Sequence, residues 1–153
     1  MLDDIDRRIL ATLQTNAALS LAELADRVGL SKNPCWRRVK RLEEDGVIRG
    51  RVALLDGKRL NLGLTAFIAV RTNQHTADWL ETFAAAVRDL PEIVGAFRMT
   101  GDVDYLLHAV VSDMKAYDAL YQRLIDRIEL SDVSSSFVME EIKQTTALPL
   151  NYA

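Results

Sequence analysis

Residues 20–46 read SLAELADRVGLSKNPCWRRVKRLEEDG and predict two helices joined by a tight turn. Ser20 followed by Glu23 is a capping box, which marks the beginning of a helix. Gly29 supplies the left-handed position that ends this helix, and Ser31 caps the next one. A helix, a short turn around a glycine and a second helix form the helix-turn-helix pattern, which places its second helix in the DNA major groove.

The second of these helices separates an apolar stripe from a basic one. At 100° per residue, Cys35, Val39 and Leu42 share one side, which must face the core. Basic and polar side chains occupy the opposite side and the flanks, as a helix needs if it is to reach phosphates and base edges. A solvated helix face is the alternative reading of such a charge run. The candidate DNA-binding residues of this helix are Ser31, Lys32, Asn33, Trp36, Arg37, Arg38, Lys40 and Arg41.

The residues after this helix, 47–54 (VIRGRVAL), predict a strand with two arginines on one face, which would form a basic wing. The expected base or phosphate contacts are Arg37, Lys40 and Arg41, and the expected backbone-positioning residues are Ser31, Lys32, Arg38, Arg49 and Arg51. Trp36 either packs on the sugar-phosphate backbone or braces the wing, and the sequence does not decide between the two.

The charge of the chain is divided unevenly along its 153 residues. The net charge is −3 and the isoelectric point is about 5.4, which taken alone disfavours a nucleic-acid partner. Residues 1–62, however, hold 12 Lys and Arg against 9 Asp and Glu, whereas residues 63–153 hold 7 against 13. The basic first part is therefore still suited to binding DNA.

Strands and helices alternate after residue 63. Strand-like stretches lie at 64–72, 93–100, 103–111 and 133–143, with helices that begin near Thr76 or Asp78 and at Asp113. The order strand-helix-strand-strand-helix-strand predicts a ferredoxin-like domain. Such a sheet has helices on one face only, and its other face is most simply covered by the same sheet of a second subunit. A homodimer is therefore expected.

Together these patterns predict an α+β chain of two domains. A first helix, capped by Asp3 or Asp4 and ending near Asn16, precedes the helix-turn-helix. We expect a winged helix-turn-helix DNA-binding domain at residues 1–50, a strand linker at residues 51–62, and a ferredoxin-like βαββαβ domain at residues 63–153.

The sequence lacks the residues that several classes of protein require. One cysteine, Cys35, excludes an intramolecular disulfide and leaves too few thiols for a zinc knuckle, and His75 and His108 lie too far apart for a metal-ligand motif. No apolar run is long enough to span a bilayer, and the acidic start MLDDIDRR is not a signal peptide. The sequence predicts a cytoplasmic protein without a structural metal or cofactor.

Catalytic groupings are absent from the sequence as well. It contains no pairing of Ser, His and Asp or of Cys and His with catalytic spacing, no P-loop and no GxGxxG. A dimeric ferredoxin-like enzyme, or a metabolite-binding module acting on a small amino acid, is the alternative function. Neither would explain the basic helix-turn-helix half.

Seven stretches spread over nearly the whole chain carry a resemblance to a known family. They are LDDIDRRIL (2–10), LAELADRVGLS (21–31), NPCWRRVKRLEEDGVI (33–48), VALLD (52–56), TGDVDYLL (100–107), DMKAY (113–117) and FVMEEIK (137–143). In this order they resemble the Lrp/AsnC, or feast/famine, transcription factors. The resemblance implies a DNA-binding regulator of amino-acid metabolism that forms dimers and often octamers of four dimers, with an amino-acid effector bound between subunits.

The resemblance also implies an effector region, formed by the turn at residues 100–105 and the facing part of the last strand. The implied effector-binding residues are Thr100, Gly101, Asp102, Asp104, Tyr105, Ser134, Ser135 and Ser136. A turn carboxylate can accept the α-ammonium group of an amino acid. A plain hairpin turn, a metal held by the two aspartates and plain exposed sheet at the serines are the alternatives. Stretches such as SSSFVMEEIKQTTALP (134–149) look closest to cysteine-responsive activators of cysteine detoxification.

Overall fold

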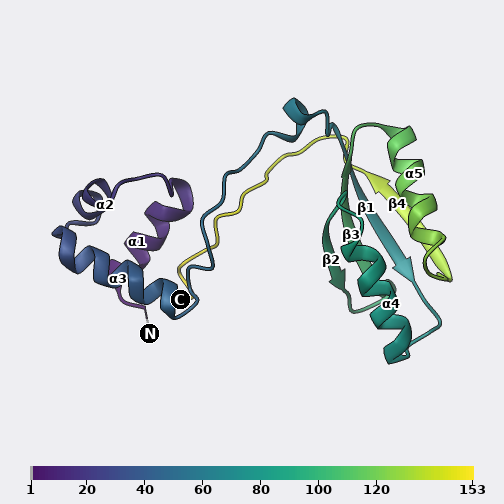
Figure 1. Cartoon of the computed structure of the whole chain (residues 1–153), viewed down its shortest axis with the longest axis horizontal. Coiled ribbons are helices and arrows are strands. Elements are labelled where there is room, and N and C mark those ends of the chain that lie inside the picture. Colours follow the sequence, from purple (N-terminus) through teal and green to yellow (C-terminus); the bar gives the residue numbers. More distant parts are fainter. Residues whose placement is uncertain (1) are drawn as a thin grey trace. The chain divides into compact units, whose positions relative to one another are not determined.

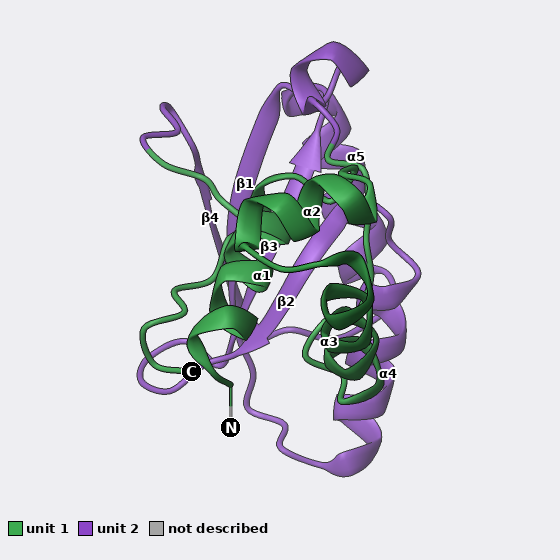
Figure 2. Ribbon diagram, turned by 90° about the vertical axis from the view of Figure 1, so that its left-hand side faces the viewer, with its two compact units in different colours: residues 1–54, 143–153 green, residues 55–142 purple. Residues whose placement is uncertain are grey.

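The computed structural model describes residues 2–153 and divides the chain into two compact units (Figure 2). The first unit runs to Leu54 and also contains Lys143–Ala153, and the second unit is Leu55–Ile142. The first unit is therefore discontinuous in sequence, and two chain segments connect it to the second. The domain expected at residues 63–153 differs from this division, because its last eleven residues belong to the first unit.

Three helices form the first unit (Figure 1). They are α1 (Asp4–Thr15), α2 (Leu21–Val28) and α3 (Lys32–Glu44). The predicted caps are confirmed: Asp3 caps α1, and Ser20 forms the capping box of α2 with Glu23. Gly29 ends α2 with a φ of 70°. Ser31 precedes α3 as predicted, but its hydroxyl makes no capping hydrogen bond. Nowhere in residues 2–153 is a helix long and apolar enough to cross a membrane.

The three helices bury their apolar stripes in a common core. Its buried members are Ile9, Leu10, Leu24, Ala25, Val28, Cys35, Val39 and Leu42. The predicted inward stripe of α3 is thereby confirmed. Burial raises the pKa of the Cys35 thiol, so the thiol stays protonated at neutral pH. Cys35 therefore packs as a small apolar side chain.

The C-terminal segment, residues 143–153, packs on α1. The Leu148 N–H donates to Gln14 Oε1 at 2.6 Å, and Gln14 Nε2 donates to the Leu148 carbonyl at 3.2 Å. Arg7 Nε donates to the Ala153 carbonyl at 3.0 Å. Leu150 packs against the core of the first unit, and the segment lines an open, mainly apolar pocket of about 620 Å³ together with Leu10. These contacts make the segment part of the first unit.

The strand predicted over residues 47–54 is wrong for this single chain, because no strand lies between α3 and Leu64. Residues 51–62, predicted as a strand linker, contain instead a short 3₁₀ helix, Gly57–Leu60, which Asp56 caps. An alternating sequence forms a strand only where a second strand accepts its backbone hydrogen bonds. Within the described residues no strand pairs with 47–62.

The second unit has the predicted order of strands and helices. They are β1 (Leu64–Arg71), α4 (Ala77–Arg88), β2 (Ile93–Arg98), β3 (Tyr105–Val111), α5 (Met114–Ile125) and β4 (Asp132–Phe137). The sheet order is β2-β3-β1-β4, and all neighbouring strands are antiparallel. β4 ends at Phe137 rather than at the predicted Lys143: its paired register with β1 stops at Ala66 and Phe137, and one further backbone hydrogen bond, from the Val138 N–H to the Thr65 carbonyl, follows it.

The two faces of this sheet are different. Helices α4 and α5 cover one face (Figure 1) and enclose the core with Ile68, Val70 and Leu107. On the other face, Phe67 lies opposite His108, and their rings stack with centroids 4.9 Å apart. Leu106 lies two residues before His108 on β3 and therefore shares this bare face. Phe97 pairs directly with Leu106, and directly paired residues share a face, so Phe97 lies there as well.

Candidate DNA-binding surface and effector site

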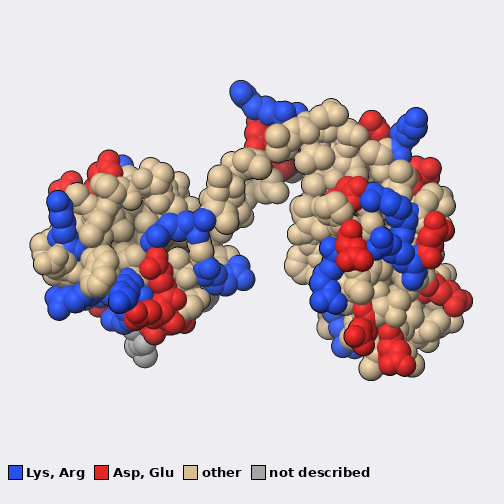
Figure 3. Space-filling view, viewed as in Figure 1, with Lys and Arg blue, Asp and Glu red and all other residues tan. Residues whose placement is uncertain are grey.

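The exposed side of α3 carries the residues predicted to contact DNA. Lys32, Asn33 and Arg37 are exposed, and neither Lys32 nor Arg37 is ion-paired within the described chain. Figure 3 shows Lys and Arg side chains gathered on the first unit beside a patch of acidic ones. Because the apolar stripe on the opposite side of α3 is buried in the core, these side chains point away from the core, as the sequence predicts.

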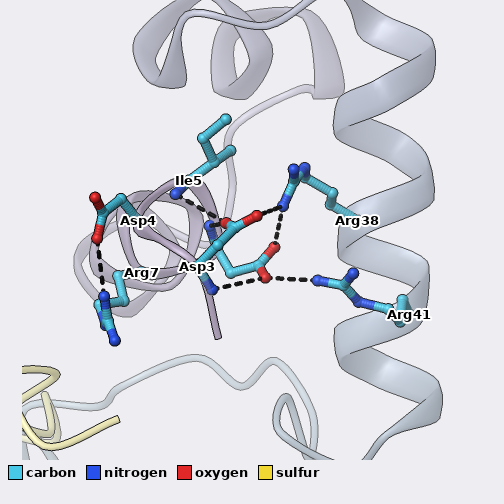
Figure 4. Close-up of polar contacts among 7 residues, drawn as sticks. Asp3, Asp4, Ile5, Arg7, Arg38 and Arg41 are labelled. Atoms are coloured by element: carbon cyan, nitrogen blue, oxygen red, sulfur yellow. Dashed lines mark hydrogen bonds and ion pairs between the residues drawn. The ribbon is translucent and has the colours of Figure 1, made fainter. Parts of the chain in front are cut away.

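Two of the predicted DNA-binding arginines are held by carboxylates of α1 and its cap (Figure 4). Arg38 Nη1 lies 2.6 Å from Asp3 Oδ2 and 2.8 Å from Asp6 Oδ1, and Arg41 Nη2 lies 2.6 Å from Asp6 Oδ2. Asp6 is 1% exposed, and each of its two carboxyl oxygens faces a guanidinium group. Both arginines therefore hold α3 against α1, a role that was not predicted for them.

This cluster shifts the ionisation of its members. The backbone N–H of Asp6, followed by the guanidinium of Arg38, lowers the pKa of Asp3 from 3.8 to about 2. Asp3 and Asp6 in turn raise the pKa of Arg38. Sequence reasoning missed Asp6, although a signal was present: an acidic residue at position 6 shares the inward helix stripe with Ile9, Leu10 and Leu13.

Lys40 and Trp36 form a pair on the exposed side of α3. Lys40 Nζ lies 5.3 Å from the centroid of the Trp36 ring and 3.5 Å from Glu44 Oε1. Trp36 is 51% exposed and lines a hollow of about 460 Å³ together with Arg51. The ring is thus accessible and also adjoins the residues that follow α3, so both of its expected roles are sterically available.

The two arginines predicted for the wing lie outside any strand. Arg51 Nη2 is 2.7 Å from Glu43 Oε1, which ties this arginine to the end of α3. Arg49 is exposed and has no ion-pair partner in residues 2–153. Of the two, Arg49 is the more available to a phosphate.

The turn predicted to bind the effector follows β2. Gly101 has a φ of 98°, which explains a glycine at this position. Asp104 Oδ2 accepts the backbone N–H of Thr72 at 2.8 Å, so this carboxylate fixes the neighbouring chain. Tyr105 packs on Phe83 with ring centroids 4.6 Å apart, which directs its ring to the helix-covered side. Asp104 and Tyr105 thus have structural partners, whereas Thr100 and Asp102 are exposed.

Arg71, at the end of β1, joins the turn to β4. Its Nε donates to the Asp102 carbonyl at 2.7 Å, and its Nη1 lies 2.7 Å from Asp132 Oδ2. Sequence reasoning missed Arg71, although a basic residue that ends the apolar strand LTAFIAVR is a recognisable signal. The described residues contain no group of three or more His, Cys, Asp or Glu side chains that could hold a metal.

The three predicted serines of β4 lie on both sides of the sheet. Ser134 and Ser136 pair with Ala69 and Phe67 and share the bare face with them. Ser135 points the other way, where its hydroxyl hydrogen-bonds the Tyr117 hydroxyl. The structure therefore brings the turn and the start of β4 to the same end of the sheet, but it does not bring all eight predicted effector residues together.

The chain matches known proteins in both units. Residues 2–49 match the family described as winged helix-turn-helix DNA-binding, and residues 65–148 match the Lrp/AsnC ligand binding domain. It is 51% identical to the DNA-binding transcriptional activator DecR of Escherichia coli K12, over 98% of this chain and 99% of that protein.

Two solved structures have the same fold over nearly the full length. An AsnC family transcriptional regulator from Agrobacterium tumefaciens is 54% identical with a TM-score of 0.96, and 99% of each chain is covered. The transcriptional regulator NMB0573 of Neisseria meningitidis, in complex with L-Met, is 46% identical with a TM-score of 0.95 and the same coverage.

These relatives also decide between the two function classes left open by the sequence. They are named transcriptional regulators and not enzymes, which sets aside the alternative of a ferredoxin-like enzyme. The winged helix-turn-helix and the ligand-binding domain occur in the predicted order. The chain therefore belongs to the Lrp/AsnC family of DNA-binding transcriptional regulators.

Proposed function

We propose that this regulator binds double-stranded DNA through the exposed side of α3 and controls genes of amino-acid metabolism. The observation that carries this proposal is the pairing of a fully buried apolar stripe with exposed Lys32 and Arg37, neither of which has an ion-pair partner in the described chain. The Ser31 hydroxyl makes no capping bond and lies at the helix N-terminus, where a phosphate is favoured. A chromosomal DNA partner requires the cytoplasmic location that the sequence predicts.

The assignment of DNA contacts follows from which side chains are accessible. We assign base or phosphate contacts to Arg37 and Lys40, and phosphate contacts to Lys32 and Arg49. Trp36, beside Lys40, is accessible to the sugar-phosphate backbone.

We infer that a small amino acid binds beside Arg71 at the end of the sheet and tunes DNA binding. The Asp102 carboxylate and the Ser134 hydroxyl are exposed towards that end, Ser136 follows two residues further along β4 opposite Phe67, and these groups suit an ammonium group and a polar side chain. The relative that was solved with L-Met supports an amino-acid ligand, and the sequence resemblance favours cysteine or another small or apolar one. Ligand and DNA would then change each other's affinity by the same factor.

The assembly that we propose is a homodimer formed through the bare face of the sheet, with octamers of four dimers as the further assembly implied by the resemblance. Phe67 is 38% exposed and Phe97 56% exposed on that face of the single chain. A large apolar face of this kind favours burial against a second copy.

The test is DNA binding by fluorescence anisotropy, with duplexes selected by the wild-type chain from a random pool. We expect affinity to fall steeply between 50 and 200 mM salt, and Arg37→Ala to weaken binding and lower the salt slope. Arg88→Ala, an exposed arginine of α4, is the matched control and should change neither. Binding that is independent of salt and unaffected by Arg37→Ala would contradict the assignment of α3.

The effector is identified separately, by a thermal-shift screen with the twenty amino acids. A ligand that binds the folded chain raises its melting temperature by mass action. Asp102→Ala should abolish the shift caused by the selected amino acid, whereas Asp126→Ala, an exposed aspartate at the end of α5, should preserve it.

A further inference from the structure

We propose that Asp6, assisted by Asp3, is a positioning residue for DNA recognition: it holds Arg38 and Arg41 so that these arginines orient α3 and do not contact DNA. The proposal rests on the function proposed above for α3. It divides the basic residues of this helix into an inner pair, Arg38 and Arg41, and an outer pair, Arg37 and Lys40.

The inner pair is bound to the carboxylate of Asp6, which is buried and therefore needs a cationic partner. Asp6 is 1% exposed, and each of its oxygens accepts from a different arginine, Oδ1 from Arg38 at 2.8 Å and Oδ2 from Arg41 at 2.6 Å. An uncompensated buried carboxylate is strongly destabilising, and the phosphates that would attract the arginines are themselves anionic and cannot replace them as its partners. Releasing Arg38 and Arg41 to phosphates would therefore leave the buried Asp6 carboxylate without a cationic partner, with only the Asp3 backbone N–H at 3.3 Å as a donor.

The geometry of the two helices makes this contact an orienting one. Asp3 and Asp6 are one turn apart on α1 and its cap, and Arg38 and Arg41 are one turn apart on α3. Two contacts one turn apart fix both the position of α3 along α1 and its rotation about its own axis. They connect the N-terminal end of one helix to the middle of the other (Figure 4).

Helical geometry relates the direction of the outer pair to that of the inner pair. Arg37 and Lys40 each precede a held arginine by one residue, which places them 100° around the helix. Fixing the rotation of α3 through Arg38 and Arg41 therefore fixes the direction in which Arg37 and Lys40 leave the protein. Arg37 is exposed and without an ion pair in the described residues, as a DNA contact requires.

Charge separates the inner pair from Arg37 in the same way, whereas Lys40 has the exposed Glu44 carboxylate 3.5 Å away. Asp3 and Asp6 supply two negative charges to the two positive charges of Arg38 and Arg41, at distances of 2.6 to 2.8 Å. A neutralised arginine releases no DNA counterion, because counterion release follows from phosphate neutralisation. The inner pair should therefore contribute to sequence preference but not to the salt dependence of binding.

The experiment measures the salt slope and the preference for a selected duplex over a scrambled duplex of equal length. Arg37→Ala should lower the slope by about 0.9 for each bound head. Arg41→Gln should leave the slope unchanged and lower the preference about tenfold, the size of one lost base contact. A slope lowered by Arg41→Gln as much as by Arg37→Ala would overturn the proposal, as would an unchanged preference.

Asp6 is tested in the same assay with a matched control. Asp6→Asn should lower the preference without lowering the slope, whereas Asp4→Asn, the same change on an exposed carboxylate of the same helix, should alter neither. Circular dichroism establishes that each variant is folded, and if Asp6→Asn is not, Arg38→Gln takes its place with the same expected result. A wild-type slope of zero, or Arg37→Ala without effect, would instead refute the proposed function of α3.

Discussion

Arg71 Nη1 lies 2.7 Å from Asp132 Oδ2, and this contact joins the last residue of β1 to the first residue of β4. The same guanidinium reaches the Asp102 carbonyl through Nε. One side chain thus connects both parts of the proposed effector site, which lie far apart in sequence.

We therefore expect Arg71→Gln to weaken binding of the selected amino acid by about three- to tenfold, since it removes a charged hydrogen bond that is half-exposed. The free energy of unfolding should change little, because a half-exposed ion pair contributes little to stability. Isothermal titration calorimetry measures the affinity, and Arg88→Gln on α4 is the control. Unchanged affinity in Arg71→Gln would mean that the ligand binds elsewhere.

Low pH should lower the stability of the first unit, because Asp3 becomes protonated. Its pKa is about 2 in the folded chain against an ordinary 3.8, so its contribution to stability is complete above pH 4. That contribution is lost as the pH falls from about 4 to about 2. Urea unfolding at a series of pH values should show this loss in the wild type and a smaller one in Asp3→Asn. Identical pH dependence in the two chains would contradict the shift.

The C-terminal segment should stabilise the three helices to which it binds. Leu150→Ala removes a half-buried side chain that packs on their core and should lower the free energy of unfolding by about 1–2 kcal/mol. Tyr152→Ala, at a residue 87% exposed, should have little effect. Hydrogen exchange of α1 amides measures the difference, and equal protection in both variants would show that the segment contributes no stability.

The bare sheet face gives a prediction on assembly. Phe67→Asp places a charge where a second copy is proposed to pack, and burial of an unpaired carboxylate should prevent association. Light scattering after gel filtration should then report a mass near the 17.2 kDa of one chain. Leu80→Asp, at an exposed position of α4, should leave the assembly as in the wild type. A Phe67→Asp chain that assembles normally would exclude this face.

The features that the sequence predicted well are local ones. The beginning and end of α2 are determined by Ser20, Glu23 and Gly29 through hydrogen bonds within a few residues. The residues adjacent in sequence therefore suffice to predict both ends of this helix. The inward stripe of α3 likewise depends on its own periodicity. The order of elements in the second unit follows from the same kind of pattern.

The features that it missed depend on contacts between distant residues. Asp6 and Arg38 are 32 positions apart, and helical periodicity shows that Arg38 is on a flank of α3 but not what faces it. Ser135 was grouped with Ser134 although the pleat places its hydroxyl against Tyr117. The strand predicted at 47–54 failed because alternation does not supply the partner that a strand requires.

The order of the chain has a consequence for its synthesis. The ribosome makes α1, α2 and α3 first, but residues 148–150, which pack on them, emerge only after the whole of Leu55–Ile142. A nascent or prematurely terminated chain thus carries its helix-turn-helix with an open apolar surface beside α1. The first unit is therefore completed only after the whole second unit has been made.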